Sequence, residues 1–340
     1  MSNRVRLLVA ALLNGSPVTM SPLRISYQTE CFPAGSIANG LAHLDTSWDD
    51  VLWAAVTVGR PNRHYVFRHG DASIYEAIFR WSLIRMSLEQ SGPGSRRLRS
   101  TSAARTLDTT EKGWVSYFIG MTFCKLFAAR LLNTPWLLHL DVFRQYLNLV
   151  LNGRSRPDLV GKEHGTGIWH AFECKGRISP PNDAVKQKAK NQADRLVSVH
   201  GTVCSLHIGA ITYLRGDVLQ FYWRDPVPEK AKPIEIPFSG SHWRYYYAPV
   251  TQLITANQDY QKRMQSESGV FLPVADLDLE VGIHPLVAVP LFHGQWEQAH
   301  QMALRSTDTL ARAGYQPDGL AVRAGASWSR QFEDLYFSEG

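Results

Sequence analysis

Two acidic side chains and a lysine flank a short glycine-containing turn near the middle of the chain. Asp158 precedes the turn at residues 164–167, and Glu173 and Lys175 follow it. The two glycines of the turn tolerate positive φ, so we predict a β-hairpin with strands at about residues 156–161 and 168–175. A hairpin centred on this turn places Asp158 opposite Glu173. Alternation along a strand then puts Glu173 and Lys175 on one face, and Cys174 on the other, core-facing side.

The predicted pair of carboxylates indicates a metal site. Neighbouring carboxylates repel each other and raise each other's pKa, and a divalent cation removes this repulsion. Hard oxygen ligands suit Mg²⁺ or Mn²⁺. Lys175 could hold or deprotonate a water molecule, or neutralise the charge that develops on a phosphorane. These residues therefore predict metal-dependent phosphodiester hydrolysis, and the alternative is a surface hairpin with an ordinary Glu173–Lys175 ion pair.

The same residues resemble a known motif. Pro157-Asp158, followed after 14 residues by Glu173-Cys174-Lys175, is similar to the PD-(D/E)XK motif of the restriction-endonuclease-like nucleases. The resemblance covers about residues 109–226. It implies an α/β fold with a restriction-endonuclease-like core, a mixed central sheet flanked by helices. It also implies that Asp158, Glu173 and the carbonyl of Cys174 bind Mg²⁺ (or Mn²⁺), that Lys175 activates the attacking water, and that the product carries a 5′-phosphate.

One predicted helix precedes the hairpin and another follows it, and these two helices contain further candidate residues. The helix predicted at residues 111–132 carries Glu111, which the resemblance suggests as a further metal-supporting acid. The helix dipole explains an acid in the first turn equally well, and Asp141 is an alternative third acid.

The helix predicted after the hairpin, at about residues 182–199, is rich in lysine and glutamine. On it the resemblance suggests that Gln187 acts at the scissile strand or its water, with Lys186 and Lys190 as phosphate contacts. We also expect Arg177, at the end of the hairpin, to bind nucleic acid. An ordinary solvated helix face is the competing interpretation.

The 340-residue chain is long enough for several structural regions. We predict an N-terminal α+β region at residues 1–95, the nuclease core at 106–228 and a C-terminal α+β region at 229–340. Residues 91–102, rich in glycine, serine and arginine, are expected to form a linker or loop. The aromatic and basic residues 242–247 suggest either an edge strand or a surface that stacks on bases, and residues 283–292 suggest an irregular strand.

Composition gives weaker information about partners and compartment. The net charge of +6 suits a polyanionic partner, with DNA preferred to RNA. The four cysteines lack metal-type spacing and are expected to be free thiols in a reducing cytoplasm. No apolar stretch is long enough to predict a membrane span.

The expected biological role is a bacterial anti-phage defence or restriction effector that is controlled by a protein partner or acts as a homodimer. Two alternatives stay open. One is a catalytically silent nucleic-acid-binding or scaffolding subunit of a defence or transposition complex. The other is a nuclease that acts on RNA.

Overall fold

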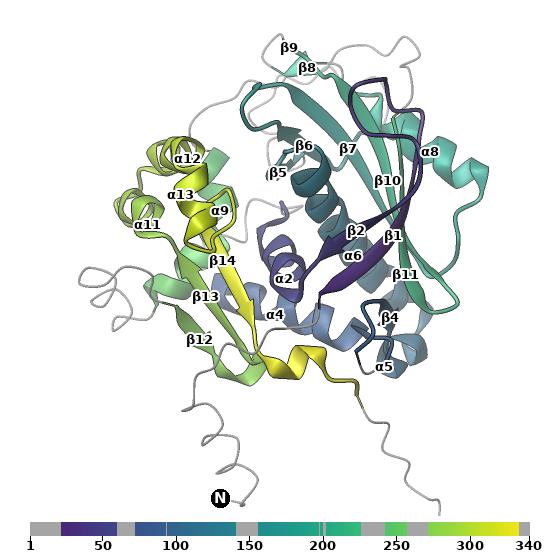
Figure 1. Ribbon diagram of the computed structural model, residues 1–340, viewed down its shortest axis with the longest axis horizontal. Helices are drawn as coiled ribbons and strands as arrows, with labels where there is room; N and C mark the ends of the chain where they lie inside the picture. The colour runs from purple at the N-terminus through teal and green to yellow at the C-terminus, as the bar shows by residue number, and fades with distance from the viewer. Residues whose placement is uncertain are drawn as a thin grey trace, which may run out of the picture.

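The computed structural model describes residues 22–59, 72–92, 94–140, 156–196, 198–199, 202–225, 242–256 and 271–332. Asp141 lies outside these ranges. The chain forms an α/β protein with a nine-stranded mixed sheet flanked by helices and a small three-stranded antiparallel sheet (Figure 1). None of the helices in the described ranges combines the length and hydrophobicity that a bilayer crossing requires.

The large sheet has the order β2-β1-β11-β10-β7-β6-β5, and β4 pairs with both β11 and β3. Its strands are β1 (Leu23–Glu30), β2 (Gly40–Thr46), β3 (Leu88–Gln90), β4 (Leu98–Ser100), β5 (Trp136–His139), β6 (Leu159–Lys162), β7 (Trp169–Arg177), β10 (Leu206–Arg215) and β11 (Val218–Arg224). The pairs β1/β11 and β7/β10 are parallel and the others are antiparallel. A separate two-stranded ribbon joins β8 (Ser198–Val199) to β9 (Thr202–Val203).

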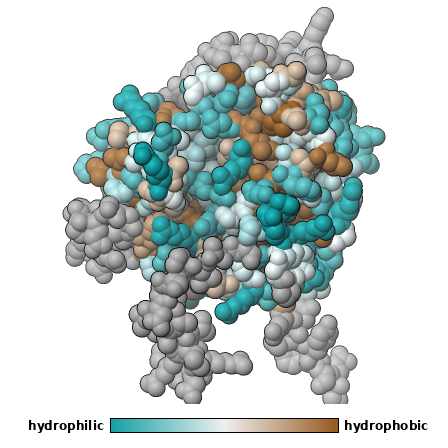
Figure 2. All heavy atoms as spheres, in the orientation of Figure 1, coloured by the Kyte–Doolittle hydropathy of each residue, from teal (hydrophilic) through white to brown (hydrophobic). Residues whose placement is uncertain are grey.

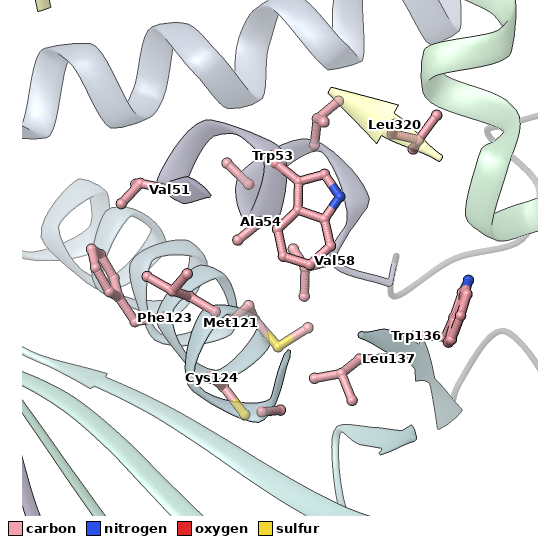
Figure 3. Close-up of a cluster of buried hydrophobic side chains, with 14 of the residues drawn as sticks. Val51, Trp53, Ala54, Val58, Met121, Phe123, Cys124, Trp136, Leu137 and Leu320 are labelled. Carbon is pink, nitrogen blue, oxygen red and sulfur yellow. The ribbon is translucent and has the colours of Figure 1, made fainter. Parts of the chain in front are cut away.

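Helices cover both faces of this sheet. They are α2 (Trp48–Thr57), α4 (Ala72–Ser87), α5 (Ser102–Thr106), α6 (Thr109–Leu131) and α8 (Asp183–Ala193). The long helix α6 packs on β7 and β10 from one side, and α8 packs on the same two strands from the other (Figure 1). Figure 3 shows side chains of α2 and α6 meeting in the core, with Val51 and Ala54 facing Phe123 and Met121. The strand β7 therefore lies between α6 on one face of the sheet and α8 on the other.

The C-terminal part adds a second group of elements. They are α9 (His242–Thr255), β12 (Leu272–Val274), the 3₁₀ helix η2 (Ala275–Leu277), β13 (Leu279–Ile283), α11 (Pro285–Phe292), α12 (Trp296–Arg305), α13 (Thr307–Arg312), β14 (Leu320–Ala324) and the 3₁₀ helix η3 (Ala326–Ser329). The strands form the sheet β12-β13-β14, and β14 packs against α2.

Figure 2 shows that hydrophobic residues on one face of the molecule gather in its upper central part, among hydrophilic ones.

Strands from the first two predicted regions form one sheet. The strands β1 to β3 come from residues 1–95, and β5 to β11 come from residues 106–228. Buried side chains from all three predicted regions also belong to one hydrophobic cluster. The predicted division into three regions stays a prediction. The shared sheet and the shared hydrophobic cluster show that the described parts of these regions pack together.

The segment at residues 91–102 was expected to be a linker or loop, and this expectation is wrong for its second half. It contains β4, whose Leu98 is buried, and β4 pairs with β3 and β11. The guanidinium of Arg99 lies 2.9 Å from the carboxylate of the buried Glu89. One buried leucine and one ion pair therefore hold a glycine- and arginine-rich segment in the sheet.

Two expectations for the C-terminal region are also wrong. Residues 242–247 form the start of α9 instead of an edge strand, and Trp243, Tyr246 and Tyr247 are buried there. Residues 283–292 contain the end of β13 and then α11. Pro285 occupies the first turn of α11, where its missing N–H costs no intrahelical hydrogen bond.

The close contact between α6 and β7 depends on glycine. A Cβ at Gly176 would overlap the backbone oxygen of Ser116, and one at Gly120 would lie 2.8 Å from the carbonyl carbon of Lys175. Both obstacles are backbone atoms, which cannot rotate away as a side chain can. The helix therefore lies directly against the end of the strand that carries Glu173 and Lys175.

Replacing Gly176 with alanine should displace α6 from β7. Overpacking of this kind costs about 1–3 kcal/mol or more in the free energy of unfolding, because the added methyl group meets main chain. Denaturant unfolding measures the effect. The matched control is Gly113→Ala on the same helix, where a Cβ meets nothing within 4 Å; a Gly176 variant as stable as this control would contradict the packing argument.

Candidate active site

The hairpin predicted from the sequence forms in the predicted register. The strands β6 and β7 pair antiparallel, with Leu159 opposite Phe172 and Lys162 opposite Trp169. Asp158 directly precedes β6, and its Oδ2 accepts a hydrogen bond of 2.8 Å from the backbone N–H of Cys174. This bond holds the Asp158 carboxylate beside the strand that carries Glu173.

The two faces of β7 also agree with the prediction. Phe172 and Cys174 face the core with Leu159, and burial favours the neutral thiol of Cys174 by raising its pKa. Glu173 and Lys175 pair with Gly209 and Ile211 of β10, which face α8. Paired residues in neighbouring strands share a face. The glutamate and the lysine therefore lie together on the α8 side of the sheet.

Glu173 is the chemically unusual group of this cluster. Its side chain is only 1% exposed. Its Oε1 accepts a hydrogen bond from Nζ of Lys175, whose side chain is 31% exposed and thus connects the buried carboxylate to the surface. Its Oε2 is buried and has no hydrogen-bond donor among the described residues, and when one of the two carboxyl groups is protonated Glu173 and Asp158 hydrogen-bond to each other. Burial first, and then the neighbouring Asp158, raise the pKa of Glu173 to about 8.

Asp158 lies in a more balanced environment. Burial raises its pKa, whereas the N–H of Cys174 and the ammonium of Lys175 act in the opposite direction. Two carboxyl groups therefore adjoin each other in a site that favours the protonated form of at least one of them. This costs free energy in a metal-free protein and is relieved when a cation replaces the proton.

The donor set fits a hard divalent cation. It offers the two carboxylates, with one oxygen of Glu173 unpartnered, and the backbone carbonyl of Cys174 remains a third ligand by resemblance only. Its thiol is buried in the core and is not a candidate ligand. The described residues, which do not include Asp141, contain no cluster of three His, Cys, Asp or Glu side chains that could hold a metal.

Glu111 is not brought to this site. It is exposed, and its carboxylate accepts a hydrogen bond from the backbone N–H of Asp108, which caps α6. Cys124 of the same helix contacts Cys174. At 1.5 Å per residue, Glu111 lies ~20 Å farther along the helix. The capping interpretation therefore accounts for Glu111, and the metal role suggested by resemblance has no geometric support.

Gln187 also points away from the carboxylates. It is exposed on α8, and its amide donates to Oδ1 of Asn191 at 2.9 Å. The sheet-facing side of this helix is formed instead by Ala189 and Ala193, which are buried. The glutamine expected to reach the scissile strand is thus on the solvent side of the helix.

The two predicted phosphate-binding lysines of α8 lie on its far flank. Lys186 is 3.5 Å from the carboxylate of Glu30 and 4.4 Å from the ring centroid of Tyr222, so its ammonium already has partners. Lys190 follows one turn later on the same side. Arg177 is the last residue of β7 and lines a pocket with Ser116 and Ile119 of α6, so its binding to nucleic acid stays a prediction.

Helix geometry identifies two residues that sequence reasoning did not select. Lys188 and Gln192 are one turn apart on the flank of α8 opposite to Lys186 and Lys190, which is the flank toward β7. The Oε1 of Gln192 is buried and has no hydrogen-bond partner among the described residues. The sequence contained a signal for this orientation. Ala189 and Ala193 are small apolar residues four positions apart in a polar helix, which is the spacing of a buried face.

Comparisons with protein-family models, with curated proteins and with solved structures find no match for this chain.

The raised pKa of Glu173 predicts that metal binding depends on pH. A cation must displace the proton, so affinity for Mg²⁺ should rise about tenfold per pH unit and level off above pH 8. Between its ordinary pKa and about 8, Glu173 binds more protons in the folded state than in the unfolded state. The metal-free protein should therefore lose stability as pH rises through this window.

Calorimetric Mg²⁺ titrations across this range, with denaturant unfolding in EDTA, measure both effects. The Glu173→Gln variant should lose both pH dependences. A wild-type affinity for Mg²⁺ that is constant below pH 8 would contradict the assigned ionisation.

Proposed function

We propose that this protein is a metal-dependent nuclease of the PD-(D/E)XK type that hydrolyses phosphodiester bonds, with DNA as its substrate. The order of elements supports this proposal. The helix α6 is followed by β5, β6 and β7, then by α8 and β10, and these strands lie in the order β5-β6-β7-β10 with β7 and β10 parallel. This order supports the proposal because it agrees with the helix, strand, hairpin, helix, strand order that the resemblance implies.

The observation that carries the proposal is the buried, partly unpartnered carboxylate of Glu173 beside Asp158. A structural ion pair with Lys175 would satisfy only one of the two Glu173 oxygens, and it would leave the neighbouring Asp158 unexplained. Unpartnered buried polar atoms cost about 1–3 kcal/mol each and are rare in proteins without a functional reason.

Each residue has a role in the proposed reaction. Asp158 and Glu173 would hold Mg²⁺ or Mn²⁺, which supplies Lewis-acid stabilisation of charge when it is bound. Lys175, partly exposed, would orient the attacking water and accept or share its proton. The water oxygen forms a new bond to phosphorus, the P–O3′ bond breaks, and the 3′-oxygen leaves as a hydroxyl after protonation. The products are then a 5′-phosphate and a 3′-hydroxyl.

The biological role remains part of the proposal. An anti-phage or restriction effector that is controlled by a protein partner, or that acts as a homodimer, fits a nuclease surrounded by large additional elements. No observation on the described residues favours a catalytically silent subunit.

A cleavage assay tests the proposed function. Supercoiled plasmid, linear duplex DNA, single-stranded DNA and RNA are each incubated with the full chain in Mg²⁺, in Mn²⁺ and in EDTA. We expect cleavage of DNA with a divalent cation, and none with EDTA or with the Asp158→Asn variant. Equal cleavage by Asp158→Asn would indicate a contaminating nuclease, and cleavage of RNA alone would favour the RNA-directed alternative.

A further inference from the structure

A cavity that the proposed reaction does not use lies at the turn end of the hairpin. Its volume is about 650 Å³, within the ~300–1,000 Å³ that small-molecule sites usually have. We call it the tryptophan cavity. It is lined by Trp136, Lys162, Glu163, His164, Gly165, Thr166, Gly167, Trp169, Trp243, Glu297, His300, Gln301 and Leu304.

Aromatic rings form one wall of the tryptophan cavity. Trp243 stacks on His300 with a centroid distance of 3.5 Å, and Trp136 meets His300 edge-on at 4.8 Å. Trp169 contributes a third indole from β7 and is 5% exposed. A wall of rigid indoles suits a planar ligand, because such a ligand gains stacking contact at little cost in conformational entropy.

The polar groups of the cavity are unevenly satisfied. Glu163 accepts a hydrogen bond of 2.7 Å from Thr166, and Glu297 accepts one of 3.0 Å from Gln301. Both carboxylates thus have donors within the protein. The nitrogens are less well served, since Nδ1 of His164 is buried without a hydrogen-bond partner among the described residues, and Nδ1 of His300 lies 3.9 Å from the carboxylate of Glu297.

Lys162 is the cation of the cavity. Its Nζ lies 5.7 Å from the ring centroid of Trp169, and it forms no ion pair within the described ranges. Burial lowers the pKa of His300, so its imidazole is neutral near pH 7 and can meet a neutral heterocycle, while Lys162 is left to meet an anion. The cavity therefore offers indole faces, the neutral imidazole of His300, and an ammonium that has no ion-pair partner within the described ranges, beside two carboxylates that already have donors.

We propose that the tryptophan cavity binds a nucleotide, with its base against the indoles and its phosphate at Lys162. An imidazole can donate to or accept from the ring nitrogens and exocyclic groups of a base. A phosphate would give Lys162 an anionic partner, which it lacks within the described ranges. A purely apolar ligand would leave Nδ1 of His164 unsatisfied.

The nucleotide could be free or could belong to a bound strand. Trp136, Lys162 and Trp169 are register partners across β5, β6 and β7, so they share a face with Glu173. Trp169 and Glu173 are four residues apart on one strand, which corresponds to ~13 Å. A strand whose phosphate reaches Glu173 could therefore place a nearby unpaired nucleotide in the cavity.

Calorimetric titration tests this proposal without any cleavage. The full chain with Glu173→Gln is titrated in EDTA with 5′-AMP, adenosine, inorganic phosphate and a short single-stranded DNA. We expect 5′-AMP or the DNA to bind, adenosine to bind about tenfold more weakly than 5′-AMP or worse, and Lys162→Gln to remove that difference. Because the readout is binding in EDTA, it is independent of whether the carboxylate site hydrolyses DNA.

Two further variants keep the result interpretable. Gln301→Trp on α12 should fill the cavity and abolish binding, whereas Arg312→Gln removes an equal charge from an exposed position and should change nothing. Binding of DNA with no binding of 5′-AMP would identify a subsite for the substrate strand, and binding of 5′-AMP alone a site for a free nucleotide. Absence of both, or binding that Lys162→Gln and Gln301→Trp leave unchanged, would overturn the proposal.

Discussion

Replacing Glu173 with glutamine should abolish Mg²⁺-dependent cleavage and, in the same variant, stabilise the metal-free protein. Loss of a metal-binding carboxylate removes several kcal/mol of transition-state stabilisation, so we expect cleavage to fall by at least about 10³-fold. The amide is nearly isosteric and carries no charge, so it removes both the cost of burying a carboxylate and the repulsion with Asp158, which together raise the pKa of Glu173. We expect a gain of about 1 kcal/mol in unfolding free energy in EDTA at pH 8 or above.

The opposite sign is expected if the hairpin is only structural. In that case Glu173→Gln would lose the ion pair with Lys175, lower the stability and leave any nuclease activity intact. The matched control is Glu111→Gln, which changes an exposed capping carboxylate on α6 and should retain activity. Cleavage rates and denaturant midpoints measured on the same preparations separate the two interpretations.

The second large effect is expected at Asp318, which is fully buried at the start of the segment leading into β14. Its Oδ2 accepts hydrogen bonds from Tyr246 at 2.6 Å and from Trp53 at 2.8 Å, and its Oδ1 accepts one from the N–H of Leu320 at 3.0 Å. The ammonium of Lys125, also fully buried, donates to the hydroxyl of Tyr246 at 2.8 Å. This network links α2, α6 and α9 to the C-terminal strand.

Asp318→Ala should lower the free energy of unfolding by about 3–5 kcal/mol. The substitution removes the acceptor of two buried donors, the indole N–H of Trp53 and the N–H of Leu320, and the nearer of two acceptors of the Tyr246 hydroxyl, and it leaves Lys125 without its counter-charge. Burial lowers the pKa of Lys125 to about 7 and raises that of Asp318, so neither group tolerates isolation as an ion. Urea denaturation measures the loss.

The control for this network is Asp308→Ala, an aspartate in the first turn of the short helix α13. We expect it to change stability by no more than about 0.5 kcal/mol. If Asp318→Ala were equally mild, the buried network would not be what joins the C-terminal elements to α6.

Local patterns in the sequence were sufficient to predict the centre of the candidate site. The glycine turn at residues 164–167 sets the register of β6 and β7, and alternation then assigns the faces of Glu173 and Lys175. Both rules act over a few residues, so they need no knowledge of the rest of the chain. The same is true of where α6 and α8 begin, because polar caps at Asp108 and Asn182 precede both helices, whereas α8 ends at Ala193, before the predicted end at about residue 199.

Features that depend on distant contacts were not predictable. The sequence does not indicate that β1 pairs in parallel with β11, about 190 residues away, or that Lys125 and Asp318 meet through Tyr246. The orientation of α8 also depends on contacts with residues that are distant in the sequence. Lys186 turns toward Tyr222 and Glu30, which come from β11 and β1, and this fixes Gln187 on the solvent side.

A Mn²⁺ soak of crystals followed by anomalous diffraction tests the metal site most directly. We predict one anomalous peak in contact with the carboxylates of both Asp158 and Glu173, and its loss in crystals of the Glu173→Gln variant grown under the same conditions. A map with no peak between these side chains, or the same peak in the variant, would contradict the assignment of this hairpin as a metal-dependent hydrolytic centre.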